Sequence, residues 1–223
     1  MPELIGPLHA EAVAARLAQA RARIERAATQ AGRDPAAVEL LVAGKYVAVH
    51  DLDRLARAGV TLIGENRAQD LEAKVGAWGE RFAWDFIGQL QSRKVRAIVP
   101  HVRLIHSLAS ASAARELARW QEQARPGLEV LVEVNVSGEP GKAGVLAGEI
   151  DALIERCPLP VTGLMTMPPQ APDPEQSRRW FAALRELARE RGLTRLSMGT
   201  SQDYPVAVQE GATIVRLGRG LLA

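Results

Sequence analysis

The chain has 223 residues, of which 47% are hydrophobic and 24% are charged, a composition typical of a soluble globular protein. Its 28 Lys and Arg residues are interleaved with 26 Asp and Glu residues, so the net charge of +2 provides no basic surface for nucleic acid. The single cysteine, Cys157, excludes an intramolecular disulfide and argues against a cysteine-based metal site.

The beginning of the chain lacks the basic region and the continuous apolar core of a signal peptide. Apolar runs elsewhere are too short to span a membrane. We therefore expect a cytoplasmic protein whose partners include neither nucleic acid nor a membrane.

The first predicted element is a helix over residues 9–31, because Val13, Leu17 and Ile24 share one face and Gly32 ends the pattern. Eight short apolar segments follow and are predicted to be strands: residues 38–45, 61–66, 82–88, 104–109, 128–136, 161–167, 195–200 and 213–218. Helical patterns lie between them, at residues 51–59, 65–75, 110–125, 146–156 and 174–192.

Eight strand–helix units in about 190 residues predict a small (β/α)8 TIM barrel, and we expect residues 1–223 to form a single domain. An open doubly wound sheet is the competing fold, but no Gly-rich dinucleotide motif follows the first strand. Only six residues follow Leu217, so the last helix is expected to be a stub or missing. The extra N-terminal helix then either caps the bottom of the barrel or replaces the last helix.

Polar side chains gather where the predicted strands end, which is the face where barrels of this kind hold their active groups. Lys45 ends the first strand and has two interpretations. It is either a lysine that extends to water or a desolvated amine that can form a Schiff base with an aldehyde.

The loops after the last two strands predict an anion site. Residues 196–205, LSMGTSQDYP, place Thr200 and Ser201 before a helix-like segment, and Gly218 follows the last strand. Phosphate sites in such barrels are often built by the loops after strands seven and eight.

Arg216 lies among apolar neighbours just before the second of these loops, a costly place for an unpaired guanidinium. A Schiff-base lysine, a phosphate site and an arginine that faces a ring are the parts of a pyridoxal phosphate (PLP) site. A Schiff-base aldolase or a sugar-phosphate isomerase without cofactor is the alternative for these groups.

Longer motifs carry a family resemblance over the whole barrel: LLVAGK, IGENRAQDLEAK, WDFIGQLQSRK, VLVEVNVSGEPGKAGV, GLMTMPP and LSMGTSQDYPVAVQEGATIVRLG. In these motifs the chain resembles the pyridoxal phosphate homeostasis proteins and, more distantly, the barrel domain of alanine racemases. The resemblance implies that PLP is the cofactor and that its binding residues are Lys45, Asn66, Met165, Ser201, Arg216, Gly218 and Arg219.

Three positions depart from the family pattern. Gly44 replaces the usual Ser before the lysine, Asp85 replaces the His of WHFIG, and Arg219 stands where a small hydroxyl residue is common. The last departure leaves the detail of phosphate recognition open.

The family resemblance implies a protein that holds PLP within the vitamin B6 pool and hands it to apo PLP-dependent enzymes, as a monomer or a weak dimer. The alternative is a PLP-dependent amino-acid racemase, which needs a second proton carrier. Tyr46 is expected to point away from Lys45 if the strand continues past it. Tyr204 is expected to pack beside Pro205, and no lid domain is expected after Ala223. We therefore expect a binding protein without catalytic residues, and no metal site, since the four histidines lack ligand spacing.

Overall fold

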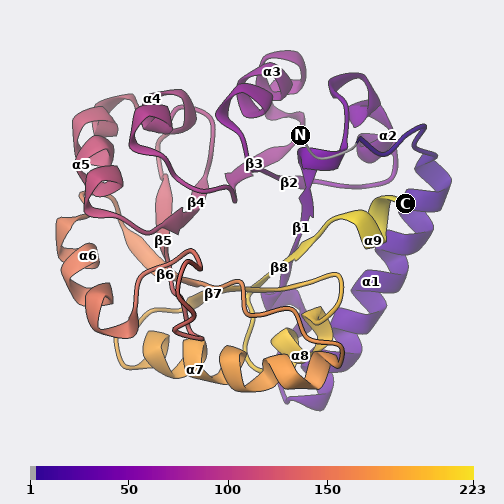
Figure 1. Cartoon of the computed structure of the whole chain (residues 1–223). Helices are drawn as coiled ribbons and strands as arrows, with labels where there is room; N and C mark the ends of the chain where they lie inside the picture. Colours follow the sequence, from indigo (N-terminus) through magenta and orange to yellow (C-terminus); the bar gives the residue numbers. More distant parts are fainter. Residues whose placement is uncertain (1–3) are drawn as a thin grey trace.

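A computed structural model describes residues 4–223 and shows strands and helices in alternation (Figure 1). The strands are β1 (Glu39–Ala43), β2 (Leu62–Glu65), β3 (Ala83–Phe86), β4 (Leu104–Leu108), β5 (Glu129–Glu133), β6 (Val161–Met165), β7 (Arg195–Thr200) and β8 (Ile214–Leu217). The helices are α1 (Ala10–Gln30), α2 (Leu52–Arg57), α3 (Ala68–Trp78), α4 (Val95–Ile98), α5 (Ala111–Trp120), α6 (Ile150–Arg156), α7 (Arg178–Arg189), α8 (Tyr204–Gln209) and α9 (Arg219–Leu222).

The eight strands form one closed parallel barrel in the order β1 to β8. Closure is made by β1, which pairs with β2 on one side and with β8 on the other, where Leu41 lies opposite Arg216. All the strands therefore end at the same rim, as Figure 1 shows from the barrel end. The predicted (β/α)8 barrel is confirmed.

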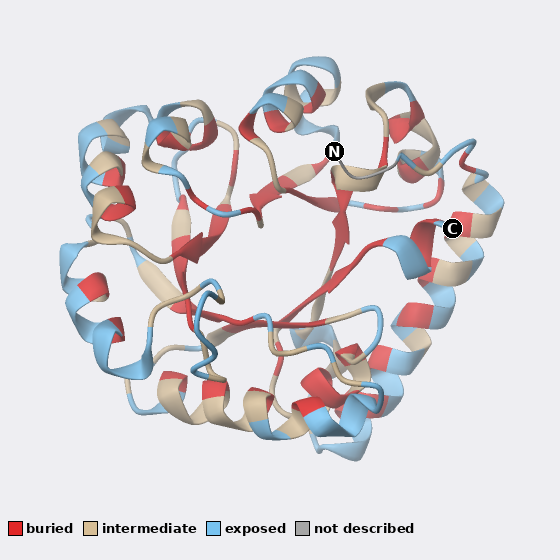
Figure 2. Ribbon diagram, viewed as in Figure 1, coloured by how far each residue is buried: buried red, intermediate tan, exposed pale blue. Residues whose placement is uncertain are grey.

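The core has two parts. Inside the barrel, one buried side chain from each of six strands forms a separate apolar cluster: Leu41, Leu62, Leu104, Leu131, Met165 and Ile214. A larger cluster lies between the strands and the helices. Figure 2 shows this arrangement, with buried strands at the centre and helices that are buried on their inner sides and exposed outside. Successive side chains of a strand point alternately into the barrel and toward the helices. Since both of these faces are buried, both are apolar, as expected for a parallel sheet.

The N-terminal helix α1 takes the place of a full-length last helix. The segment after β8 is the four-residue stub α9, and α1 packs against α8, α9 and α2. Figure 1 shows α1 lying along the outside of β8 and β1. Of the two expectations for the N-terminal helix, the structure confirms replacement of the last helix and not a cap on the bottom.

Two further findings concern the helices. The short helix α4 lies between β3 and β4, where the sequence analysis named no helical pattern, because only four residues carry it. Within residues 4–223, no helix combines the length and the apolar character needed to cross a lipid bilayer.

Candidate functional site

Lys45 lies just beyond β1, in a 3-10 turn formed by Gly44–Tyr46. Lys45 is partly buried, between the buried and the exposed class. The strand ends before Lys45, so the condition under which Tyr46 is expected to point away is not met, and the Lys45 Nζ lies 5.0 Å from the centroid of the Tyr46 ring. Lys45 and Tyr46 are therefore neighbours at the rim.

The backbone before Lys45 is held by a buried ion pair. Lys74 of α3 donates one hydrogen bond to the Gly44 carbonyl over 2.7 Å and another to the Glu65 carboxylate at the end of β2. Both side chains are almost fully buried. Burial raises the pKa of Glu65, and the nearby charge and hydrogen bond of Lys74 only partly offset that effect.

The same contacts explain why residue 44 is glycine. A Cβ at this position would overlap the Glu65 carboxylate and would lie 2.8 Å from Cγ2 of Ile63. The departure of Gly44 from the family pattern is therefore coupled to the packing of Glu65 beneath the turn.

The loops after β7 and β8 meet beside Tyr46. The Gly218 N–H donates to Ser201 Oγ over 3.3 Å, and a Cβ on Gly218 would lie 2.9 Å from Tyr46 Cε2. The guanidinium of Arg219 lies 5.4 Å from the centroid of the same ring. Lys45, Gly218 and Arg219 thus adjoin one aromatic side chain, and Ser201 joins this cluster through its hydrogen bond with Gly218.

Arg216 is buried inside the barrel at the end of β8, with 6% of its surface exposed. Its Nη1 donates to Ser197 Oγ over 2.5 Å, and its Nη2 donates to the Thr166 carbonyl over 2.9 Å. Burial lowers its pKa to about 10, against the influence of the carboxylates of Glu133 and Asp203. The guanidinium therefore stays charged at neutral pH, although hydroxyl and carbonyl oxygens hold it.

Asn66 and Met165 complete the predicted set. The side-chain oxygen of Asn66 is buried and has no hydrogen-bond partner among residues 4–223, which is unusual because buried polar atoms are normally paired. Met165 is buried at the end of β6 and belongs to the cluster inside the barrel. All seven predicted residues therefore lie at the ends of β1, β2, β6, β7 and β8, or just after them.

Two other polar residues near the rim, Asn135 and Lys142, make their contacts within the loop after β5. The Asn135 side chain accepts hydrogen bonds from Ser137 and from the Gly138 N–H, and Lys142 pairs with Glu139 on the surface. Asn135 therefore stabilises the turn after β5.

Buried charges that were not predicted from the sequence support the rim. Lys74 shares a helix face with the buried Leu71, three residues before it. A lysine on an apolar helix face indicates a buried charge, so this residue could have been found from the sequence. Asp85, His106 and Ser197 form a hydrogen-bonded chain to Arg216, which no spacing in the sequence could reveal.

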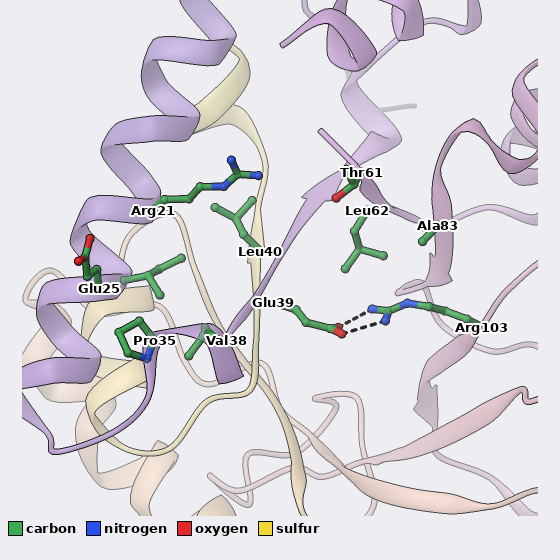
Figure 3. A pocket seen from close by; sticks show the side chains of 12 residues that line it. Arg21, Glu25, Pro35, Val38, Glu39, Leu40, Thr61, Leu62, Ala83 and Arg103 are labelled. Atoms are coloured by element: carbon green, nitrogen blue, oxygen red, sulfur yellow. Dashed lines mark hydrogen bonds and ion pairs between the residues drawn. The ribbon is translucent and has the colours of Figure 1, made fainter. Parts of the chain in front are cut away.

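A cavity of about 540 Å³ lies at the opposite end of the barrel, between α1 and the beginnings of the first strands. Figure 3 shows Arg21 and Glu25 of α1 on one side and the Glu39–Arg103 ion pair on the other. None of the seven predicted residues lines it. The described part of the chain contains no group of three His, Cys, Asp or Glu side chains arranged to hold a metal ion.

Comparisons with known proteins identify the family of the chain. Residues 16–222 match the family model of the alanine racemase N-terminal domain. A pyridoxal phosphate homeostasis protein of Aquifex aeolicus is 40% identical over an alignment of 214 positions that covers 91% of this chain and 94% of the relative. The chain belongs to the pyridoxal phosphate homeostasis protein family.

Other members of the family support the assignment. The pyridoxal phosphate homeostasis protein of Pseudomonas aeruginosa is 37% identical, with 94% of each chain covered. The structure of PipY from Synechococcus elongatus with PLP bound superposes with a TM-score of 0.77 at 29% identity, covering 95% of this chain and all of PipY. The family resemblance expected from the sequence motifs is confirmed.

Proposed function

We propose that this protein binds PLP as a Schiff base on Lys45 and holds it as part of the cell's vitamin B6 supply, without turning over a substrate of its own. The proposed compartment is the cytoplasm, and the proposed recipients are apo PLP-dependent enzymes. Support comes from the homeostasis relatives and from PipY, whose structure has PLP bound.

The residues at the rim fit the chemical groups of PLP. The observation that carries the proposal is the cluster around Tyr46, which brings an amine next to the Ser201–Gly218 loops. Ser201 and the N–H groups at Gly218 and Arg219 would hold the phosphate, and Arg216 would donate to the ring nitrogen. The unpaired oxygen of Asn66 and the side chain of Met165 would contact the ring. When bound, PLP supplies an aldehyde and an electron-accepting ring.

Lys45 would make the covalent link. It would supply the amine that condenses with the aldehyde of PLP, a C=N bond replacing the C=O bond with loss of one water. Lys45 is only partly buried, so PLP and water could reach it from the rim. That accessibility suits a protein that takes up PLP and releases it.

Arg216 favours storage over catalysis. A guanidinium donates hydrogen bonds and stays protonated at neutral pH, so it discourages the ring nitrogen from taking a proton. With Arg216 as its partner, the ring of bound PLP would withdraw electrons weakly and would support transamination poorly.

An amino-acid racemase is the second candidate, and the position of Tyr46 favours it. The phenol lies beside Lys45 instead of pointing away, so a second group that can carry a proton is present at the rim. Incubation of the PLP-loaded protein with each L-amino acid tests this candidate. Fast, saturable formation of a D-amino acid that is lost in Tyr46→Phe would replace the storage role.

The decisive experiment for the proposed function is borohydride reduction of the PLP-loaded protein followed by mass spectrometry of its peptides. We expect one pyridoxyl group, on Lys45, and a visible absorption band that Lys45→Ala removes. Lys94→Ala is the matched control, since Lys94 is a partly exposed lysine outside the predicted set, and it should retain both signals. An unchanged band in Lys45→Ala, with the adduct on another lysine, would contradict the proposal.

A further inference from the structure

A chain of side-chain hydrogen bonds crosses the barrel interior and ends on Arg216. Arg103 Nε donates to Asp85 Oδ1 over 2.9 Å, and Asp85 Oδ2 lies 3.0 Å from His106 Nε2. His106 Nδ1 lies 2.8 Å from Ser197 Oγ, which accepts from Arg216 Nη1. Asp85, His106 and Ser197 have no exposed surface. Four strands, β3, β4, β7 and β8, are thereby linked from the beginning of the barrel to its functional rim.

The direction of the protons in this chain follows from the charges at its two ends. Asp85 accepts hydrogen bonds from the Arg103 guanidinium and therefore acts as an acceptor toward His106. Burial lowers the pKa of His106, as do the charges of Arg216 and Arg103, although Asp85 acts in the opposite sense. His106 is consequently a neutral imidazole with a single N–H.

Only one tautomer of a neutral imidazole satisfies both of its neighbours. The proton must lie on Nε2, because Asp85 only accepts, and Nδ1 must then accept the hydrogen of the Ser197 hydroxyl. The Ser197 oxygen is thereby left as an acceptor that faces the Arg216 guanidinium. Every donor in the chain points toward Asp85.

We propose that Asp85 is a positioning residue for Arg216: through the Nε2–H tautomer of His106 and the hydroxyl of Ser197, it fixes the guanidinium at the ring-nitrogen end of the cofactor site. The inference rests on the proposed PLP-binding function.

The substitution Asp85→Asn reverses the donor and acceptor roles along these hydrogen bonds, and the side chain keeps nearly the same size and shape. Arg103 still requires an acceptor, so the amide oxygen turns toward it and the amide N–H faces His106 Nε2. The imidazole proton then moves to Nδ1 and donates to Ser197, whose own hydrogen loses its acceptor. The Arg216 guanidinium therefore loses its well-directed acceptor at Nη1 and is held less firmly at the ring-nitrogen end, although it stays charged and keeps its hydrogen bond to the Thr166 carbonyl.

A matched control separates this effect from the loss of charge beside Arg103. Glu39 forms a two-point ion pair with Arg103, with Nη1 to Oε1 at 2.9 Å, but it makes no hydrogen bond to His106. The substitution Glu39→Gln removes one negative charge from Arg103, as Asp85→Asn does, and leaves the chain from Asp85 to Arg216 intact.

The first measurement is the nitrogen-15 spectrum of the histidine rings without PLP, with the His106 signals assigned by their loss in His106→Gln. We expect the Nε2–H form in the wild type and in Glu39→Gln, and the Nδ1–H form in Asp85→Asn. The second measurement is titration with PLP, followed by visible absorption. Asp85→Asn should bind PLP about tenfold more weakly and with a shifted band, whereas Glu39→Gln should stay within about twofold of the wild type.

Three results would overturn the inference: an Nδ1–H or doubly protonated His106 in the wild type, unchanged PLP affinity in Asp85→Asn, or an equal loss in Glu39→Gln. If Asp85→Asn fails to fold, Ser197→Ala cuts the chain at its next link and should weaken PLP binding by a similar factor; unchanged affinity there would also overturn it. A wild type with the Nε2–H tautomer that binds no PLP would overturn the proposed function while supporting the hydrogen-bond chain.

Discussion

Some buried charged side chains of this barrel have ion-pair partners, whereas Arg216 has none among residues 4–223. Lys74 pairs with Glu65, and Asp85 pairs with Arg103. Within the described residues, Arg216 forms no such ion pair, and a hydroxyl and a carbonyl hold it instead. A buried charge without a counter-ion reduces stability. The proposed ring-facing role of Arg216 would use this charged donor.

His106 gives a pH-dependent prediction at the scale of one residue. Burial holds its pKa below the ordinary value of 6.5, so the unfolded chain takes up a proton at a higher pH than the folded protein does. The free energy of unfolding should therefore fall as the pH drops below about 6.5, with a slope of up to about 1.4 kcal/mol per pH unit. Urea denaturation at several pH values between about 7 and 5 measures this slope.

The substitution His106→Gln removes the titrating group and should flatten this part of the profile. His50→Gln is the matched control, because His50 is exposed on the surface, and it should leave the slope as in the wild type. Equal slopes in the wild type and in His106→Gln would show that His106 is not held neutral by the fold.

At the scale of elements, α1 is the helix on which the barrel most depends. It packs against α8, α9 and α2 and covers the junction of β8 with β1, where α9 is too short to do so. After α1, Arg33 Nη2 donates to the Ala212 carbonyl over 2.9 Å and ties the helix end to the turn before β8. The N-terminal helix is therefore an integral layer of the fold.

Truncation of a core side chain on α1 tests this role. Ile24 is 4% exposed and also lines the cavity at the bottom of the barrel, which lets its surroundings relax. We expect Ile24→Ala to lower the free energy of unfolding by about 2–3 kcal/mol, within the range for buried aliphatic residues. Arg23→Ala, on the exposed face next to it, should change stability by less than about 0.5 kcal/mol. Equal effects of the two substitutions in chemical denaturation would show that α1 is a dispensable appendage.

At the scale of the whole molecule, closure of the barrel joins the first strand to the last. Since β1 pairs with β8 and α1 packs on α8 and α9, both ends of the chain contribute to one core. The prediction that residues 1–223 form a single domain follows from the strand pattern and stays a prediction. If the prediction is right, no part of the barrel unfolds separately from the rest.

Chemical denaturation tests this prediction with two probes. Tryptophan fluorescence reports on Trp84 in β3 together with the tryptophans of α3, α5 and α7, and circular dichroism reports on all helices. Both probes should give one coincident transition, as expected for a single cooperative unit. Separate midpoints would divide the chain into at least two units.

The alternation of short apolar runs with helical patterns determined the barrel, because parallel strands buried on both faces can be recognised without knowing their neighbours. The same alternation placed Lys45, Ser201 and Arg216 at strand ends, and a parallel barrel brings all strand ends to one rim. The family motifs added PLP as the expected cofactor. These inferences use only the order of residues along the chain.

Only the tertiary structure decided how these residues meet. The turn after β1 ends the strand earlier than its apolar pattern suggests, which leaves Lys45 half-buried and turns Tyr46 toward it. The hydrogen bonds that connect Asp85 to Arg216 join strands far apart in sequence. Such contacts depend on the stagger of a closed barrel and on the direction of each side chain inside it. Both are set by the packing of all eight strands together and by no local pattern.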